Sequence, residues 1–266
     1  MSIIIKNIEN KSRKIVAKLE NYCVVEYVED VTGAPQNASE EFFKNKTGIR
    51  RRQLFVQLDG EKTLVTQAGA LLWVAGKVEM STGVKNPYDF VTKFFKGKVT
   101  KESTVKPEYT GVGVVAMEPV EKFIILQDVA SWGEKGMIVE DGMFYACDKT
   151  VNHTLVQRTN ISSAALGNEG LFNLNLSGTG IVALESYIPQ NELIEIEIVD
   201  DVLKIDGSYA VCWSASLEFS VEMSDDSIIG SLVNKEGLVN VYRGTGKILI
   251  SGVKSIDDVK SVEKKG

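Results

Sequence analysis

Glu169-Gly-Leu-Phe-Asn-Leu-Asn-Leu-Ser-Gly178-Thr-Gly180-Ile-Val-Ala-Leu-Glu185 is the stretch that decides the fold, because related stretches lie on both sides of it. Residues 102–118 contain Gly111-Val-Gly113, and residues 236–250 contain Gly244-Thr-Gly246. The glutamates that begin the three stretches, Glu102, Glu169 and Glu236, follow each other at a period of 67 residues. A fixed period indicates that one structural unit has been copied, so we predict three internal repeats between about residues 50 and 253.

The runs between these stretches have the alternation of β-strands. In Leu193-Ile-Glu-Ile-Glu-Ile-Val199, isoleucine and glutamate alternate, which places them on opposite faces of a sheet. Asp-Gly steps at 59–60, 141–142 and 206–207 separate such runs and are typical of tight hairpin turns. We predict one continuous, all-β, antiparallel fold in which each Asp-Gly step turns a hairpin.

Three segments are expected along the chain. Residues 1–48 lie outside the repeat and combine strand-like runs with a short helix near Ser39-Glu-Glu; residues 49–253 form the triplicated β domain; residues 254–266 form a polar C-terminal tail. The first repeat carries an insertion in which Asn86-Pro87 and Gly97 are typical of the two ends of a short helix. Its aromatic residues, with Phe94 and Phe95 among them, either cover an open end of the β structure or form a patch for a partner or a lipid surface.

The Gly-x-Gly pairs do not match a nucleotide-binding loop. A dinucleotide fingerprint has a third glycine and opens a helix, whereas Gly180 is followed by the β-branched run Ile181-Val-Ala-Leu. We interpret the glycines as structural or assembly positions, where a turn or a close approach of two backbones excludes a side chain. They are Gly111, Gly113, Gly178, Gly180, Gly244 and Gly246. The repeated Glu102, Glu169 and Glu236 either cap their own turns or converge as a ring for a cation or a subunit contact.

Composition argues against several classes of protein. The net charge of −6 disfavours a broad nucleic-acid surface, and the one basic run, Arg50-Arg51-Arg52, is either a local anion site or the solvated end of an element. The chain has no apolar stretch of about 18 residues, and its first residues lack the apolar core of a signal peptide. Three widely spaced cysteines, Cys23, Cys147 and Cys212, favour reduced thiols and a cytoplasmic location.

No catalytic, metal or cofactor site can be assembled from the sequence. The single histidine, His153, has no Gly-x-Ser-x-Gly motif to serve and no ligands at metal spacing, so we interpret it as a surface or strand-end residue. Cys147 and Cys212 occupy equivalent repeat positions and are expected to be buried structural thiols. Paired carboxylates such as Asp200-Asp201 are neighbours in sequence and do not face each other across a cleft. The sequence thus predicts a protein that is not an enzyme and needs no cofactor or metal.

The repeated motifs resemble those of the AIM24 family, a group tied to mitochondrial biogenesis and also found in bacteria. The resemblance rests on Gln67-Ala-Gly-Ala-Leu-Leu-Trp73, on Gly167-Asn-Glu-Gly-Leu-Phe172 and on Glu236-Gly-Leu-Val-Asn240, each of the last two followed by Gly-Thr-Gly. It covers about residues 50–253, and the first block departs from the pattern with Ser103 where the second has Gly170. The resemblance implies a double-stranded β-helix or β-sandwich like that of the tryptophan RNA-binding attenuation protein, in a homo-oligomer such as a trimer. It implies no catalytic residues.

We therefore expect a self-associating scaffold or binding module without enzymatic activity, whose partners are copies of itself and an unidentified protein. Two alternatives stay open. One is an RNA- or nucleotide-binding ring, which the acidic balance disfavours. The other is an adaptor at a membrane surface, which rests on the aromatic residues Phe94 and Phe95.

Overall fold

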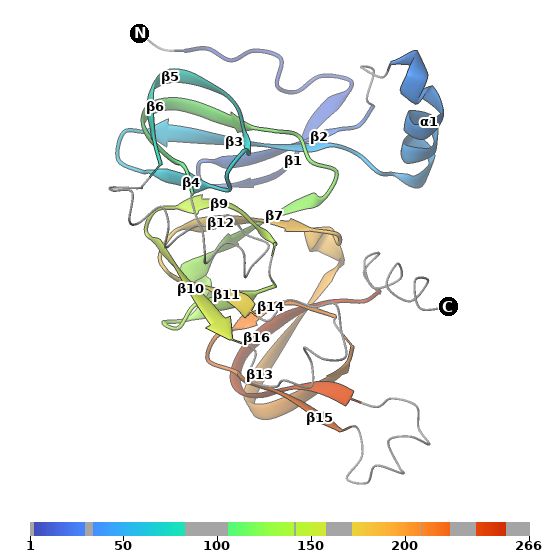
Figure 1. The fold of residues 1–266 in the computed structure, drawn as a ribbon, viewed down its shortest axis with the longest axis vertical. Helices are drawn as coiled ribbons and strands as arrows, with labels where there is room; N and C mark the ends of the chain where they lie inside the picture. Colours follow the sequence, from blue (N-terminus) through green and yellow to red (C-terminus); the bar gives the residue numbers. More distant parts are fainter. Residues whose placement is uncertain are drawn as a thin grey trace.

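A computed structural model describes residues 3–29, 34–82, 106–140, 142–157, 172–207, 209–223 and 238–253. The described chain is mainly β, with two antiparallel sheets and one short α-helix, which confirms the predicted antiparallel β class. Figure 1 shows the two sheets following each other along the long axis of the molecule, with the N-terminal strands at one end and β15 at the other. The β-branched, alternating runs of the sequence suit such half-buried pleated surfaces.

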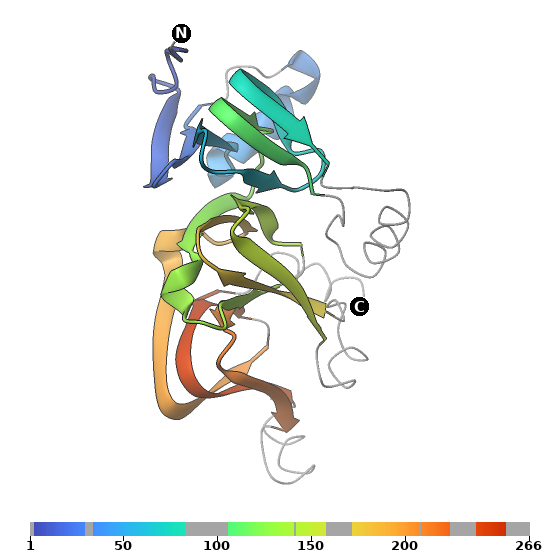
Figure 2. The same ribbon diagram turned by 90° about the vertical axis from the view of Figure 1, so that its left-hand side faces the viewer.

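The first sheet has nine strands and curls until it nearly closes into a barrel (Figure 2). Its hydrogen-bonded order is β1-β2-β3-β6-β4-β9-β12-β7, and β5 pairs with the other edge of β6. The strands at the two ends of this path, β1 and β7, lie in contact. The bounds are β1 (Arg13–Leu19), β2 (Tyr22–Tyr27), β3 (Arg52–Asp59), β4 (Leu64–Thr66), β5 (Leu71–Ser81), β6 (Glu108–Met117), β7 (Phe123–Asp128), β9 (Phe144–Asp148) and β12 (Ile181–Ser186).

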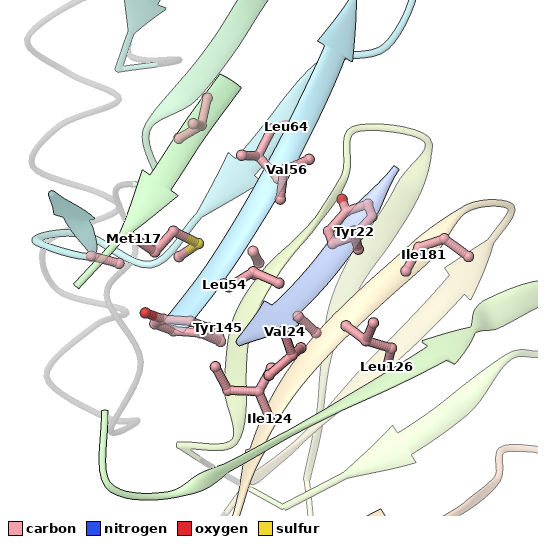
Figure 3. Packing of buried hydrophobic residues seen from close by; sticks show 14 of the residues in the cluster. Tyr22, Val24, Leu54, Val56, Leu64, Met117, Ile124, Leu126, Tyr145 and Ile181 are labelled. Carbon is pink, nitrogen blue, oxygen red and sulfur yellow. The ribbon is translucent and has the colours of Figure 1, made fainter. Parts of the chain in front are cut away.

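Apolar side chains fill the interior of this barrel. Tyr22 and Val24 of β2 point toward Leu54 and Val56 of β3, and Met117 of β6 lies beside them (Figure 3). All five are at most 1% exposed. Full burial of a side chain of this size contributes about 1.5–3 kcal/mol, so the interior is a major source of stability.

The second sheet has seven strands. Its order is β10-β11-β8-β14-β16-β13, and β15 also pairs with β16. The bounds are β8 (Met137–Val139), β10 (Val151–Gln157), β11 (Phe172–Gly178), β13 (Leu193–Asp206), β14 (Ala210–Ser214), β15 (Glu218–Met223) and β16 (Leu238–Ser251). Short 3-10 turns η2 (Val129–Trp132) and η3 (Gln190–Glu192) lie in the connections between β7 and β8 and between β12 and β13.

The two sheets share a buried layer, because several strands of the barrel are buried on both faces. Along β12, Ile181 and Ala183 face the barrel interior, whereas Val182 and Leu184 contact the second sheet. On the far side of this layer lie buried residues of the second sheet, Val139, Leu176, Cys212 and Leu249. The two sheets therefore form one continuous β structure with a common core.

The N-terminal segment packs on the barrel within the same chain. β1 and β2 form a hairpin whose two-residue turn has Glu20 at φ 49, and β2 then pairs with β3. The expected short helix is present as η1 (Pro35–Asn37) and α1 (Ala38–Thr47), which ends at Gly48 with a left-handed φ of 75. α1 has no buried residue and is held to the barrel by charge: Lys44 lies 2.6 Å from Glu121, and Arg51 lies 3.6 Å from Glu41.

The predicted Asp-Gly hairpins are wrong. β8 and β9 flank the step at 141–142 but belong to different sheets, and β13 and β14 flank the step at 206–207 but pair with opposite edges of β16. β3 and β4, on either side of Asp59, are not paired with each other either. A type I′ turn needs positive φ at both central residues, and neither Asp59 nor Asp206 has it. These steps therefore redirect the chain to a new neighbour.

Close backbone contacts occur where β5 crosses β6. Gly113 is paired with Gly76 of β5 and with Leu58 of β3. A Cβ atom built on Gly113 would overlap the carbonyl oxygen of Ala75, which belongs to the backbone and cannot rotate away. Gly113 is therefore required by proximity, since its own φ is not in the left-handed region.

We expect Gly113→Ala to lower the free energy of unfolding by about 1–3 kcal/mol, because the added methyl group must push β5 away from β6. Urea unfolding followed by circular dichroism measures this change. Gly252→Ala is the matched control, since that glycine also lacks a positive φ and its nearest foreign atom to an added Cβ lies at 3.9 Å. Equal midpoints for the two variants would contradict the crowding argument.

Candidate functional site

The single histidine lies against a cysteine. β9 ends at Asp148, the chain turns at 149–150, and β10 begins at Val151 in the other sheet. This corner brings the Cys147 sulfur to 3.4 Å from Nε2 of His153. The sequence patterns did not predict this contact. A separation of six residues around a short polar turn was the only signal of their contact.

The surroundings keep this imidazole neutral. The His153 ring packs edge-on against the Phe144 ring, and the two ring centroids lie 4.9 Å apart. The Lys106 ammonium lies over the Phe144 ring, 3.7 Å from its centroid. Burial, with the nearby positive charge of Lys106 next in importance, lowers the pKa of His153 to about 4. At neutral pH the imidazole therefore carries no charge.

The Cys147–His153 pair is a weak candidate for nucleophilic chemistry. A catalytic cysteine reacts as a thiolate, commonly formed by proton transfer to a histidine that becomes an imidazolium. A histidine with a pKa of about 4 accepts that proton poorly. Cys147 is also fully buried, so a substrate has no path to its sulfur in this conformation. The pair supplies only two donors to a metal, and the described residues contain no group of three or more His, Cys, Asp and Glu side chains that could hold one.

Asp148, the next residue, points to the other face of β9 and joins three strands of the barrel. Its carboxylate accepts a hydrogen bond from the Tyr22 hydroxyl at 3.0 Å and one from the backbone N–H of Ile181 at 2.9 Å. Lys62 approaches the same carboxylate at 3.7 Å. Burial, with the negative charge of Asp148 next in importance, raises the pKa of Tyr22 well above its usual value. A Cβ on Gly180 would lie 2.8 Å from that of Asp148, so Gly180 makes room for this buried carboxylate.

The arginine run is neutralised by carboxylates. Arg52 is 3% exposed and donates to Glu26 at 2.9 Å, while Arg50 reaches the second oxygen of Glu26 at 3.2 Å. Arg52 also donates to the backbone carbonyls of Arg50 and Glu121 and stacks on Phe123 at 3.7 Å from the ring centroid. The guanidinium therefore fastens β2 and β3 to the segment that leads into β7 and is inaccessible to a phosphate.

The six predicted glycines lie in three separate places in the fold. Gly111 and Gly113 lie within β6, Gly178 and Gly180 lie at the junction of β11 and β12, and Gly244 and Gly246 lie within β16. The first and third pairs thus lie inside long strands, and the second lies where the chain passes from one sheet to the other. Glu102, Glu169, Glu236, Phe94 and Phe95, together with the insertion helix at 86–97, lie outside the described residues.

Open sheet edges are the most extensive feature left at the surface. β5, β10, β13 and β15 each pair with one described strand on one side only. All four carry exposed apolar side chains, and Val199 of β13 is 75% exposed. An unpaired edge presents a row of backbone donors and acceptors that a further strand can satisfy. None of the helices in the described ranges has the length and apolar character needed to cross a membrane.

Comparison with known proteins identifies relatives but no activity. Residues 45–252 match the family model described as "Mitochondrial biogenesis AIM24". An uncharacterized protein of Streptococcus pyogenes serotype M6 is 29% identical over 122 residues, which is 46% of this chain and 47% of that protein, so the match spans about half of the relative. The crystal structure of another Streptococcus pyogenes protein has a similar fold, with a TM-score of 0.56 and 21% identity over 82% of this chain and 95% of that one.

His153 predicts a loss of stability on acidification. Its pKa is about 4 when folded and about 6.5 when unfolded, so the unfolded chain binds the proton first. The contribution is complete above pH 6.5 and is lost as the pH falls toward 4, a change of about 3 kcal/mol. We expect His153→Gln to remove this part of the pH dependence of the unfolding free energy. NMR titration checks the pKa directly, because the chain has one imidazole; a folded-state midpoint near 6.5 would contradict the burial argument.

Arg52 is expected to be a stability residue. Arg52→Ala leaves Glu26 half-paired and strands two backbone carbonyls, so the unfolding free energy should fall by about 3 kcal/mol. Arg51→Ala is the control: Arg51 is a neighbouring arginine with an exposed side chain and a 3.6 Å ion pair, and its loss should change stability by less than about 1 kcal/mol. Chemical denaturation of both variants measures the difference. Similar losses for the two would show that burial of Arg52 is not what matters.

Proposed function

From the premise that the chain belongs to the AIM24 family, we propose that it is a scaffold without enzymatic activity that associates with further copies of itself. The open sheet edges carry this proposal. Among the described strands, β10 at one end of the second sheet and β13 at the other each pair with a single strand. A monomer gains nothing from such edges, whereas an assembly can use them to extend its sheets.

The environments of the potentially reactive side chains support the proposal that the protein has no enzymatic activity. Three of the side chains that enzymes commonly use, those of Asp148, His153 and Cys147, are engaged with neighbours inside the protein. Asp148 is held by Tyr22, and His153 is neutral beside Cys147. These contacts account for the residues without assigning them a substrate.

We also propose that the β domain is built from three copies of one unit of about 67 residues. The second and third copies support it through equal strand registers. β8 pairs with β11 so that Val139 faces Leu174, and the second half of β13 pairs with β16 so that Lys204 faces Val241. Lys204 lies 65 residues after Val139, which is the spacing of the Asp-Gly steps at 141 and 206, and Val241 lies 67 residues after Leu174, which is the spacing of Glu169 and Glu236. The first copy departs from this register, since β3 pairs with the C-terminal half of β6.

The alternative functions gain no support from the described residues. RNA binding would use an accessible basic surface, and Arg50 and Arg52 share one carboxylate, that of Glu26. The aromatic patch of the membrane alternative lies outside the described residues. A reducing compartment remains our proposal for the location, since Cys23, Cys147 and Cys212 are widely spaced and an odd number of cysteines cannot all pair within one chain.

Native mass spectrometry of the full chain, purified gently from a bacterial cytoplasm, tests the proposal. We expect a closed oligomer whose mass is a multiple of the chain mass and includes nothing else. A monomer at micromolar concentration would reject self-association. A discrete additional mass of nucleotide, lipid or metal would reject a scaffold that works without a ligand.

A further inference from the structure

The open edges differ in how they are protected from pairing. Natural proteins guard an edge strand with charged side chains, with proline or with a bulge. β13 has both charges and a register shift, and so does β5, whose shift lies between Leu71 and Trp73. β15 carries Glu218 and Glu222. Each of these edges is thus guarded by at least one such device.

β10 has none of these protections. Its seven residues, Val-Asn-His-Thr-Leu-Val-Gln, include no Asp, Glu, Lys, Arg or Pro. The histidine is His153, which burial keeps neutral at neutral pH. The pairing of β10 with β11 runs without a register shift from Val151 to Gln157. Among the described strands, β10 is therefore free of bulges, neutral and paired with β11 alone.

From this contrast we propose that β10 is the interface through which the chain dimerises, by antiparallel pairing with the β10 of a second copy about a twofold axis. This deepens, and rests on, the self-association proposed above. The two seven-stranded sheets then continue into each other across the axis. The interface is isologous and closes on itself, so it yields a dimer and leaves the guarded edges unpaired.

The side chains of β10 suit a second copy of the same strand. Pairing centred on Thr154 keeps all seven residues opposite a partner residue and places the two Thr154 side chains across from each other. Thr154 and Val156 are exposed on the outer face, whereas Val151 on the alternate face is buried in the layer shared by the two sheets. Cross-strand threonine pairs are favourable, and no like charges meet in this arrangement.

A charged strand from a different protein is a less suitable occupant of this edge. β10 offers no charge to attract or orient it, whereas a neutral strand that meets its own copy needs no such complementarity. The acidic edge of β13 would attract a basic strand first, because Glu195, Glu197, Asp200 and Asp201 are exposed along it.

A charge-swap experiment on the full chain tests the interface. Thr154→Lys places two lysines opposite each other at the axis, and Thr154→Glu places two glutamates there. We expect each variant alone to raise the dissociation constant of the dimer by roughly a hundredfold. An equimolar mixture of the two variants should recover the dimer as a Lys–Glu heterodimer. With the Thr154→Glu chain uniformly labelled with 15N, native mass spectrometry at low ionic strength distinguishes the two homodimers and the heterodimer by mass.

Two controls make the outcomes separable. Met223→Lys adds the same charge to an exposed position of the guarded edge strand β15 and should leave the wild-type assembly intact. Circular dichroism should show melting midpoints within about 3 °C of the wild type for all variants, since the substituted positions are exposed. If Thr154→Lys keeps the wild-type mass, or the mixture fails to recover the dimer, the β10 interface is wrong and self-association stands. If the wild-type chain is itself a monomer, both proposals fail.

Discussion

Burial on both faces of β4, β7, β9 and β12 is the constraint on which the rest of the structure depends. These strands form one wall of the barrel and, at the same time, one side of the layer shared with the second sheet. Strands in such a position need nearly continuous apolar sequence, as in Phe123-Ile-Ile-Leu and Ile181-Val-Ala-Leu. A polar side chain within them must find its partners inside the protein, because water does not reach it.

This constraint explains where the polar groups of the central strands lie. They are found at the ends of strands, where the chain leaves one sheet for the next. Asp148 and Cys147 occupy one such corner, facing opposite ways, and Gly180 lies across from it. Lys122 and Glu185 pair at 2.9 Å near the other end of β7 and β12. Their interactions hold together the corners where the chain passes between the sheets.

Sequence patterns predicted the class of structure well and the pairing of strands poorly. Alternation along 193–199 indicated a strand correctly, because alternation depends only on the two faces of one strand. The Asp-Gly steps misled, because the identity of a strand's neighbour depends on contacts far away in sequence. β14 finds its partners in β8 and β16 and not in the run that precedes it.

The contact between Cys147 and His153 escaped prediction for the same reason. Their proximity arises only because the strands on either side of a short turn belong to different sheets. The low pKa of His153 follows from that placement and cannot be predicted from the residues next to it in the sequence. Close approach of backbones at Gly113, by contrast, could be anticipated from the residue type, since only glycine lacks the atom that would intrude.

The hairpin of β1 and β2 carries a consequence for how the limits of the folding unit are drawn. The family match begins at residue 45, after this hairpin and inside α1. Yet Tyr22 and Val24 belong to the barrel core, and β2 covers an edge of β3. A chain cut at the family boundary would open a cavity in the barrel and uncover that edge. The region that evolution has kept recognisable is thus smaller than the region that folds as one body.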